Sequence, residues 1–218
     1  MKFQQLSILC VLLFTFGTTF GEKISINLLN PCQSSNSEVS TRMALPINVY
    51  YNMFRNVLST QDQIAQNVLK AIDKSIFSIG SAKKALGSVQ GNKLSKDETN
   101  INQGLSNLRK SYVLNIYYFE QTHLGLKTLK DDEIAGLSKS FSGVELKTWE
   151  FGLCILDQIT LAKNAPIDYN FARDIQNSEI HKRTHWNEVL IDGYIAGFLF
   201  RDLSSAAFNF LEYMKNQG

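Results

Sequence analysis

The 218-residue sequence is poor in cysteine, proline and net charge, and each shortage excludes a class of protein. Three cysteines are too few for a small scaffold held together by many disulfides. Three prolines and 13 glycines exclude collagen-like and proline-rich sequences. A balance of 22 basic against 20 acidic residues argues against nucleic-acid binding, which usually needs a strongly basic face. With 44% apolar residues, the chain can bury a sizeable core in one domain.

Motifs of several enzyme classes are also absent from the sequence. There is no Gly-x-Ser-x-Gly segment, which positions the nucleophile of many hydrolases. There is neither a Gly-x-Gly-x-x-Gly loop nor a Walker A sequence to hold phosphate groups. We therefore expect a protein that is not an enzyme and that uses no cofactor.

The first 21 residues have the layout of a secretory signal peptide. Lys2 supplies a positive charge, residues 6–16 are largely apolar, and the small residues Thr19 and Gly21 precede a cleavage site at Glu22. The apolar run is shorter than the roughly 20 residues of a membrane-spanning helix. This pattern predicts a secreted, extracellular protein with no membrane span after cleavage. An uncleaved membrane anchor is the alternative.

Cleavage of the signal peptide would remove Cys10 and leave two cysteines, Cys32 and Cys154. An even pair of cysteines in a secreted chain predicts a disulfide bond between them. The alternative is a buried free thiol at Cys154 and an exposed thiol at Cys32.

Hydrophobic residues recur with the helical period along most of the chain after residue 45, whereas strand signals are weak. We expect long helices over 60–89, 96–129 and 143–163, and one or two helices between 168 and 214. Shorter helices are expected over 47–58 and 132–141. The helix over 96–129 has the clearest apolar stripe, formed by Ile101, Leu105, Leu108, Tyr112, Phe119, Leu126 and Leu129.

Three expected helix starts carry a capping box, in which Ser or Thr precedes Glu or Gln by three residues. The boxes begin at Thr60, Ser95 and Ser142. The box at Thr60 would separate the short helix over 47–58 from the long helix that follows. The helix that begins after Ser142 is apolar on more than one side, which is typical of a central helix.

These patterns predict an all-α protein with three parts. Residues 1–21 form the signal peptide, residues 22–45 form an irregular N-terminal segment, and residues 46–218 form the helical domain. The domain is predicted to be a single bundle of four long helices plus one or two short helices. A short strand over 23–28 would fit the sequence, but no partner strand is evident.

The candidate metal ligands are His181, His185 and Glu188. On a helix these residues lie along one side, and imidazole nitrogen and carboxylate oxygen are good ligands for zinc. The order differs from the His-Glu-x-x-His motif of metalloproteases. The neighbouring Lys182 and Arg183 would repel a cation, so an ordinary polar helix face is the other interpretation.

Two further patterns lie on the expected helix over 96–129. Glu120 and His123 have the Glu-x-x-His spacing of di-iron bundles, but such a site needs the motif twice and it occurs once. Asn115 and Thr122 interrupt the apolar stripe, so they would either line a ligand cavity or bond across the core.

Three functional hypotheses remain. The first is a secreted, non-enzymatic protein that binds a macromolecular partner, most simply another protein. The alternative is an extracellular carrier of a small apolar ligand held in a cavity between helices. The third is a metal-dependent extracellular enzyme that uses His181, His185 and Glu188. Fold class alone does not choose among them.

The signal peptide gives the first testable prediction. When the full chain is expressed in cells with a secretory pathway, we expect the medium to contain a protein that begins at Glu22. N-terminal sequencing and intact mass measure this start. A variant with Leu12→Asp and Leu13→Asp should stay inside the cells, because charges in the apolar run block its recognition. Recovery of the chain in membranes with residues 1–21 attached would contradict the prediction.

Overall fold

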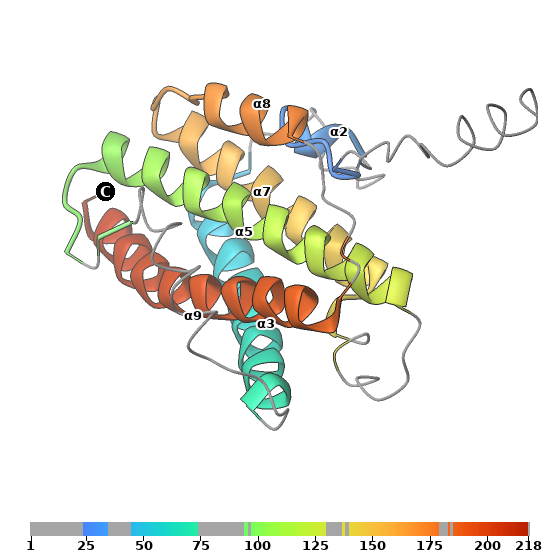
Figure 1. Cartoon of the computed structure of the whole chain (residues 1–218). Helices are drawn as coiled ribbons and strands as arrows, with labels where there is room; N and C mark the ends of the chain where they lie inside the picture. The colour runs from blue at the N-terminus through green and yellow to red at the C-terminus, as the bar shows by residue number, and fades with distance from the viewer. Residues whose placement is uncertain are drawn as a thin grey trace, which may run out of the picture.

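In a computed structural model, the structure describes residues 24–34, 45–73, 94–95, 97–129, 137, 140–178, 183 and 185–217. These residues form helices and irregular segments, and no strand occurs among them. The four long helices are α3 (Ile47–Asp73), α5 (Ile101–Leu129), α7 (Gly143–Ala162) and α9 (Trp186–Asn216), and the two short ones are α2 (Pro31–Ser34) and α8 (Asn170–Asn177) (Figure 1).

The all-α prediction, with four long helices and up to two short ones, is confirmed over this part of the chain. The predicted signal peptide lies outside the described residues, as do the expected helical residues beyond Asp73 and most of those over 132–141. Among the described helices, none has both the length and the apolar composition needed to cross a bilayer.

The four long helices close into a ring in which each packs against two others. Helix α9 contacts α3 and α5, and α7 contacts the same two helices from the other side. Figure 1 shows α5 and α9 lying side by side, while α3 crosses them and extends beyond. The short helices lie at one edge, with α2 on α7 and α8 on α5 (Figure 1).

Trp149 of α7 occupies the centre of the ring. Its side chain is 2% exposed, and its ring centroid lies 5.3 Å from that of Tyr112, 5.4 Å from Phe119 and 4.7 Å from Phe200. These separations are typical of favourable aromatic pairs. Helix α7 therefore supplies the side chain on which the three aromatic rings converge.

The predicted capping boxes have different outcomes. Ser142 does cap α7, because its Oγ accepts a hydrogen bond from the Glu145 amide at 3.4 Å. Thr60 does not begin a helix, so the separation of two helices at this position was wrong. Helix α3 runs through Thr60, whose hydroxyl donates to the Asn56 carbonyl at 3.1 Å. This bond to the preceding turn is available to a threonine inside a helix, and no glycine or proline interrupts the backbone there.

The box at Ser95 also lies outside its helix. Helix α5 begins at Ile101, and Asn100 supplies the cap, since its Oδ1 accepts a hydrogen bond from the Gln103 amide at 3.1 Å. Asparagine is among the best capping residues, so it replaces the serine that the sequence pattern favoured.

Residues 24–30, here called the strap, cross the bundle without forming a helix or a strand. Ile24, Ile26 and Leu28 are at most 5% exposed and belong to the core, and they alternate with exposed residues. Buried backbone groups need hydrogen-bond partners, and no strand pairs with the strap in the described structure. Side chains of Arg109, Glu120 and Gln176 take the place of that strand.

The buried ion pair between Arg109 of α5 and Asp157 of α7 holds the middle of the strap. Arg109 donates to the two carboxylate oxygens at 2.7 and 3.2 Å, and the two side chains are only 4% and 6% exposed. The same guanidinium donates to the Leu28 carbonyl at 3.0 Å and lies 4.8 Å from the centre of the Tyr169 ring. Loss of one partner from such a pair typically costs about 3–5 kcal/mol.

A disulfide joins Cys32 of α2 to Cys154 of α7, as the sequence predicted. The two residues are 122 positions apart, so the bond closes a long loop. Helix α2 follows the strap directly, and the disulfide therefore fixes the end of the strap to the bundle.

Removal of this disulfide should destabilise the protein. We expect the double variant Cys32→Ser with Cys154→Ser to lose about 2–5 kcal/mol of unfolding free energy, because the unfolded chain gains conformational freedom. Urea unfolding measures the loss. A reductant should destabilise the wild type by a similar amount and leave the double variant unchanged. Equal stabilities of the oxidised wild type and the double variant would show that the bond contributes nothing.

Candidate functional site

The predicted metal ligands do not form a metal centre in the described structure. His185 is the N-cap of α9, and its backbone amide donates to the Glu188 carboxylate at 3.4 Å. His181 lies outside the described residues. Among the described residues, no three His, Cys, Asp or Glu side chains are placed to hold a metal ion. The site with His181 therefore stays a prediction.

Asp192, one turn beyond Glu188, has a separate role. Arg183 donates to its two carboxylate oxygens at 2.7 and 3.0 Å, and the Asp192 side chain is 3% exposed. This pair joins the segment before α9 to the helix itself.

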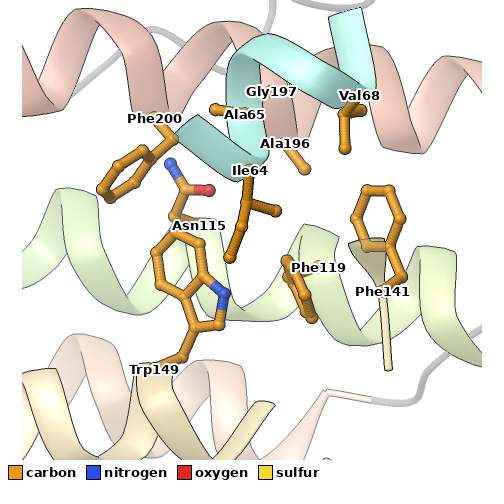
Figure 2. Close-up of a pocket in the computed structure, with 10 residues that line it drawn as sticks. All are labelled: Ile64, Ala65, Val68, Asn115, Phe119, Phe141, Trp149, Ala196, Gly197 and Phe200. Atoms are coloured by element: carbon orange, nitrogen blue, oxygen red, sulfur yellow. The ribbon is translucent and has the colours of Figure 1, made fainter. Parts of the chain in front are cut away.

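A small cavity lies in the aromatic core between the long helices (Figure 2). Its volume is about 10 Å³, which leaves room for a single water molecule at most. Figure 2 shows the side chains around it, which come from α3, α5, α7 and α9 together with Phe141: Ile64, Ala65, Val68, Asn115, Phe119, Phe141, Trp149, Ala196, Gly197 and Phe200. This cavity is too small for the apolar ligand that the sequence suggested.

Asn115 and Thr122 bond within the core. With its amide oriented to satisfy both atoms, Asn115 donates to the Ala196 carbonyl at 3.1 Å and accepts from the Phe200 amide at 2.9 Å. The Thr122 hydroxyl donates to the Tyr118 carbonyl at 2.7 Å. Of the two interpretations, bonding across the core therefore fits Asn115, while Thr122 bonds within its own helix.

A much larger pocket lies where the strap meets α5 and α7. Its volume is about 400 Å³, within the range of small-molecule sites. We call it the strap pocket, and it is lined by Ser25 and Ile26 of the strap, Glu120, His123, Leu124 and Lys127 of α5, and Gly143, Leu146, Lys147 and Glu150 of α7.

The strap pocket is lined by both acidic and basic side chains. Arg109 pairs with Asp157 and Phe119 packs on Trp149, so α5 and α7 run in opposite directions. The start of α7 therefore lies beside the end of α5. The same pairs place Lys147 of α7 level with Glu120 of α5, whereas Lys127 lies seven residues further along α5, about 10 Å along the axis. The ionisable lining residues are Glu120, His123 and Lys127 of α5 and Lys147 and Glu150 of α7.

Glu120 is the most unusual group in the pocket. It is 2% exposed, and its Oε1 accepts a hydrogen bond from the Ser25 amide of the strap. Its Oε2 is buried and has no hydrogen-bond partner among the described residues. Burial raises the pKa of this carboxyl, hydrogen bonds from Ser25 and the Ile26 amide offset part of the rise, and the nearby Glu150 carboxylate adds to it. A buried acceptor without a partner costs about 1–3 kcal/mol.

His123 lies one turn beyond Glu120, and both line the same pocket. Its Nδ1 faces the Phe141 carbonyl. Since a carbonyl only accepts hydrogen bonds, Nδ1 is the donor in this contact. The Glu-x-x-His spacing therefore brings two polar groups into one pocket, but it does not build a di-iron site among the described residues.

Comparison of the chain with protein-family models, curated proteins and solved structures finds no match. The chemistry of the strap pocket must therefore be argued from its own residues. Sequence reasoning singled out Glu120 and His123 but missed the lysines, Glu150 and Gly143. These residues were missed because they line the pocket only when the strap and α7 pack on this face of α5, and no pattern in the sequence indicates that packing.

The buried carboxyl group of Glu120 gives a prediction about stability. Its pKa is higher in the folded state than in the unfolded state, so folding binds a proton between these two values and stability falls as pH rises through them. Glu120→Gln removes this loss, so we expect the variant to be more stable than the wild type at pH 8 by about 1–3 kcal/mol. The difference should shrink as the pH falls to about 3, where the carboxyl is largely protonated in both states.

Urea unfolding at the two pH values measures this effect. The control is Glu212→Gln, which removes the exposed ion pair with Arg55 and should change stability by less than about 1 kcal/mol. Lower stability of Glu120→Gln at pH 8 would mean that the Glu120 carboxylate is well compensated in the free protein.

Proposed function

We propose that the protein is a secreted, non-enzymatic binding protein that holds a small polar molecule in the strap pocket. One observation carries the proposal: a pocket of about 400 Å³, lined by carboxylate, lysine and imidazole side chains, lies where the strap meets α5 and α7. Glu120 is one of the lining residues, and its buried Oε2 without a hydrogen-bond partner destabilises the free protein. Groups that destabilise the free protein are typical of functional sites.

The lining residues favour a polar ligand over the apolar one considered from the sequence. Five of the ten residues that line the pocket have ionisable side chains. Desolvation of these groups by an apolar ligand would be unfavourable, because the ligand would return no hydrogen bonds. A macromolecular partner stays a prediction of the sequence.

Two features support export. The sequence of residues 1–21 has the layout of a signal peptide. The Cys32–Cys154 disulfide suits an oxidising compartment, since structural disulfides are rare in the cytosol. The lack of the common catalytic motifs supports the non-enzymatic part of the proposal.

The test uses a variant that fills the pocket. Gly143 lines the pocket, and a Cβ added there meets no atom within 4 Å, so Gly143→Phe adds bulk at the pocket without a clash at its first side-chain atom. The wild type and this variant are screened by saturation-transfer NMR against amino acids, polyamines, organic acids, sugar phosphates and nucleotides. We expect at least one compound to bind the wild type and to lose binding in Gly143→Phe.

The control is Asn67→Phe, which adds the same bulk to an exposed position of α3, away from the pocket. This variant should bind like the wild type. If no compound binds the wild type, or if Gly143→Phe binds equally well, the proposed site is wrong. Conversion of a bound compound into a product would overturn the non-enzymatic part.

A further inference from the structure

We infer that the surface beneath the strap is a peptide-binding groove, which takes a short non-helical segment of a partner protein with aliphatic side chains at alternate positions. In the free protein the strap fills this groove, and the Cys32–Cys154 disulfide keeps it there. We call the surface the strap groove, and its polar groups are Arg109 and Glu120 of α5 and Gln176 of α8. A macromolecular partner goes beyond the small-molecule function proposed for the strap pocket.

The strap groove binds the backbone of the segment that it holds. The side-chain amide of Gln176 donates to the Ile24 carbonyl at 3.2 Å and accepts from the Leu28 amide at 2.8 Å, so the segment must bend to bring both groups to one side chain. Glu120 accepts from a further strap amide, and Arg109 donates to the Leu28 carbonyl at 3.0 Å. Every residue except proline carries these backbone groups. The bonds therefore select the path of the chain and not one particular sequence.

Side-chain selection comes from three apolar positions. The buried residues are Ile24, Ile26 and Leu28, each at most 5% exposed. Ser25 and Asn27 lie between them and are exposed. A partner segment therefore needs aliphatic residues at three alternate positions, because a polar side chain there would be buried in the core without a hydrogen-bond partner.

The polar groups of the groove are held in place by the bundle as well as by the strap. Asp157 binds Arg109 at 2.7 and 3.2 Å, so the guanidinium has a fixed partner apart from the strap carbonyl. Glu120 and Gln176 come from α5 and α8, which pack on each other. A surface that is ordered before binding loses less conformational entropy when a peptide enters. This order favours the binding of a second segment with the same pattern.

The covalent attachment of the strap is open to attack from outside. Cys32 is half-buried, whereas Cys154 is 2% exposed. A thiolate therefore reaches the Cys32 sulfur, where the new sulfur–sulfur bond forms while Cys154 leaves as a thiolate. One disulfide replaces another, so this step needs no oxidant or reductant. The strap is then held by noncovalent contacts alone, and a partner segment competes with it for the groove.

The test is an exchange reaction on the mature protein. A peptide with the sequence of residues 23–33, its cysteine joined to glutathione by a disulfide, is added at about 1–5 mM, which is typical of the effective concentration of a tethered segment. A trace of reduced glutathione opens the Cys32–Cys154 bond. The Cys154 thiolate then attacks the peptide disulfide and releases glutathione. We expect the peptide to become linked to Cys154, as measured by intact mass and peptide mapping.

A peptide with a shifted register tests the apolar positions. Residues 24 and 25 exchange places in it, and so do residues 26 and 27, so the composition is unchanged while both isoleucines move to positions that are exposed in the strap. We expect this peptide to be linked at least tenfold less than the unaltered one. An unfolded chain would react with both peptides equally, so the comparison also reports on the fold.

Methylation of one peptide nitrogen tests the recognition of the backbone. A methyl group on the Leu28 nitrogen removes the hydrogen bond to Gln176, and we expect at least tenfold less linkage. The control is methylation of the Leu29 nitrogen, whose bond is to the Asn27 side chain of the same segment. This peptide should be linked much more than the one methylated at Leu28.

Three results would overturn the inference. One is equal linkage of the unaltered peptide and either the shifted or the Leu28-methylated peptide, since the groove would then select neither side chains nor backbone. Another is the absence of linkage to Cys154 at about 5 mM peptide. The third is a dimer that forms without peptide and joins Cys32 of one chain to Cys154 of another, measured by light scattering and peptide mapping, because the occupant would then be a second copy of the protein.

Discussion

The strap places buried backbone amides and carbonyls against a bundle that has no strand to pair with them in the described structure. Side chains from three helices provide the missing hydrogen bonds, and Arg109 connects the most elements. It bonds the Leu28 carbonyl while it is paired with Asp157 and stacked near Tyr169. Because α5, α7 and the strap share this one guanidinium, their relative positions are fixed together. The disulfide then adds a covalent constraint at the end of the strap.

Hydrogen bonds between helix side chains and the strap also shape the pocket. One oxygen of Glu120 is used to hold the strap through the Ser25 amide, and the other is left without a partner. The strap also covers this carboxylate and excludes water, which is why its pKa rises. Structural stability and a buried acceptor without a partner therefore come from one side chain.

Local sequence patterns predicted the features that depend on local contacts. Helical periodicity and the serine cap of α7 follow from residues a few positions apart, and the disulfide followed from an even number of cysteines. The predicted helix start at Thr60 was wrong because a threonine can either cap a helix or bond back within one. The strap pocket depends on contacts across long separations, such as the 95 residues between Ser25 and Glu120. No spacing in the sequence reveals such a contact. The Glu-x-x-His pattern therefore indicated two of the residues that line the pocket, but it indicated neither the lysines nor the contribution of the strap.

The buried side chains of the strap change how the chain divides into parts. The sequence places the start of the helical domain at residue 46, where the helical period begins. Ile24, Ile26 and Leu28 nevertheless share one continuous core with the long helices. A fragment that begins at residue 46 would expose the apolar groove that these residues fill and leave Asp157 and Arg109 without the strap. The packed core of this protein therefore includes a segment without regular secondary structure.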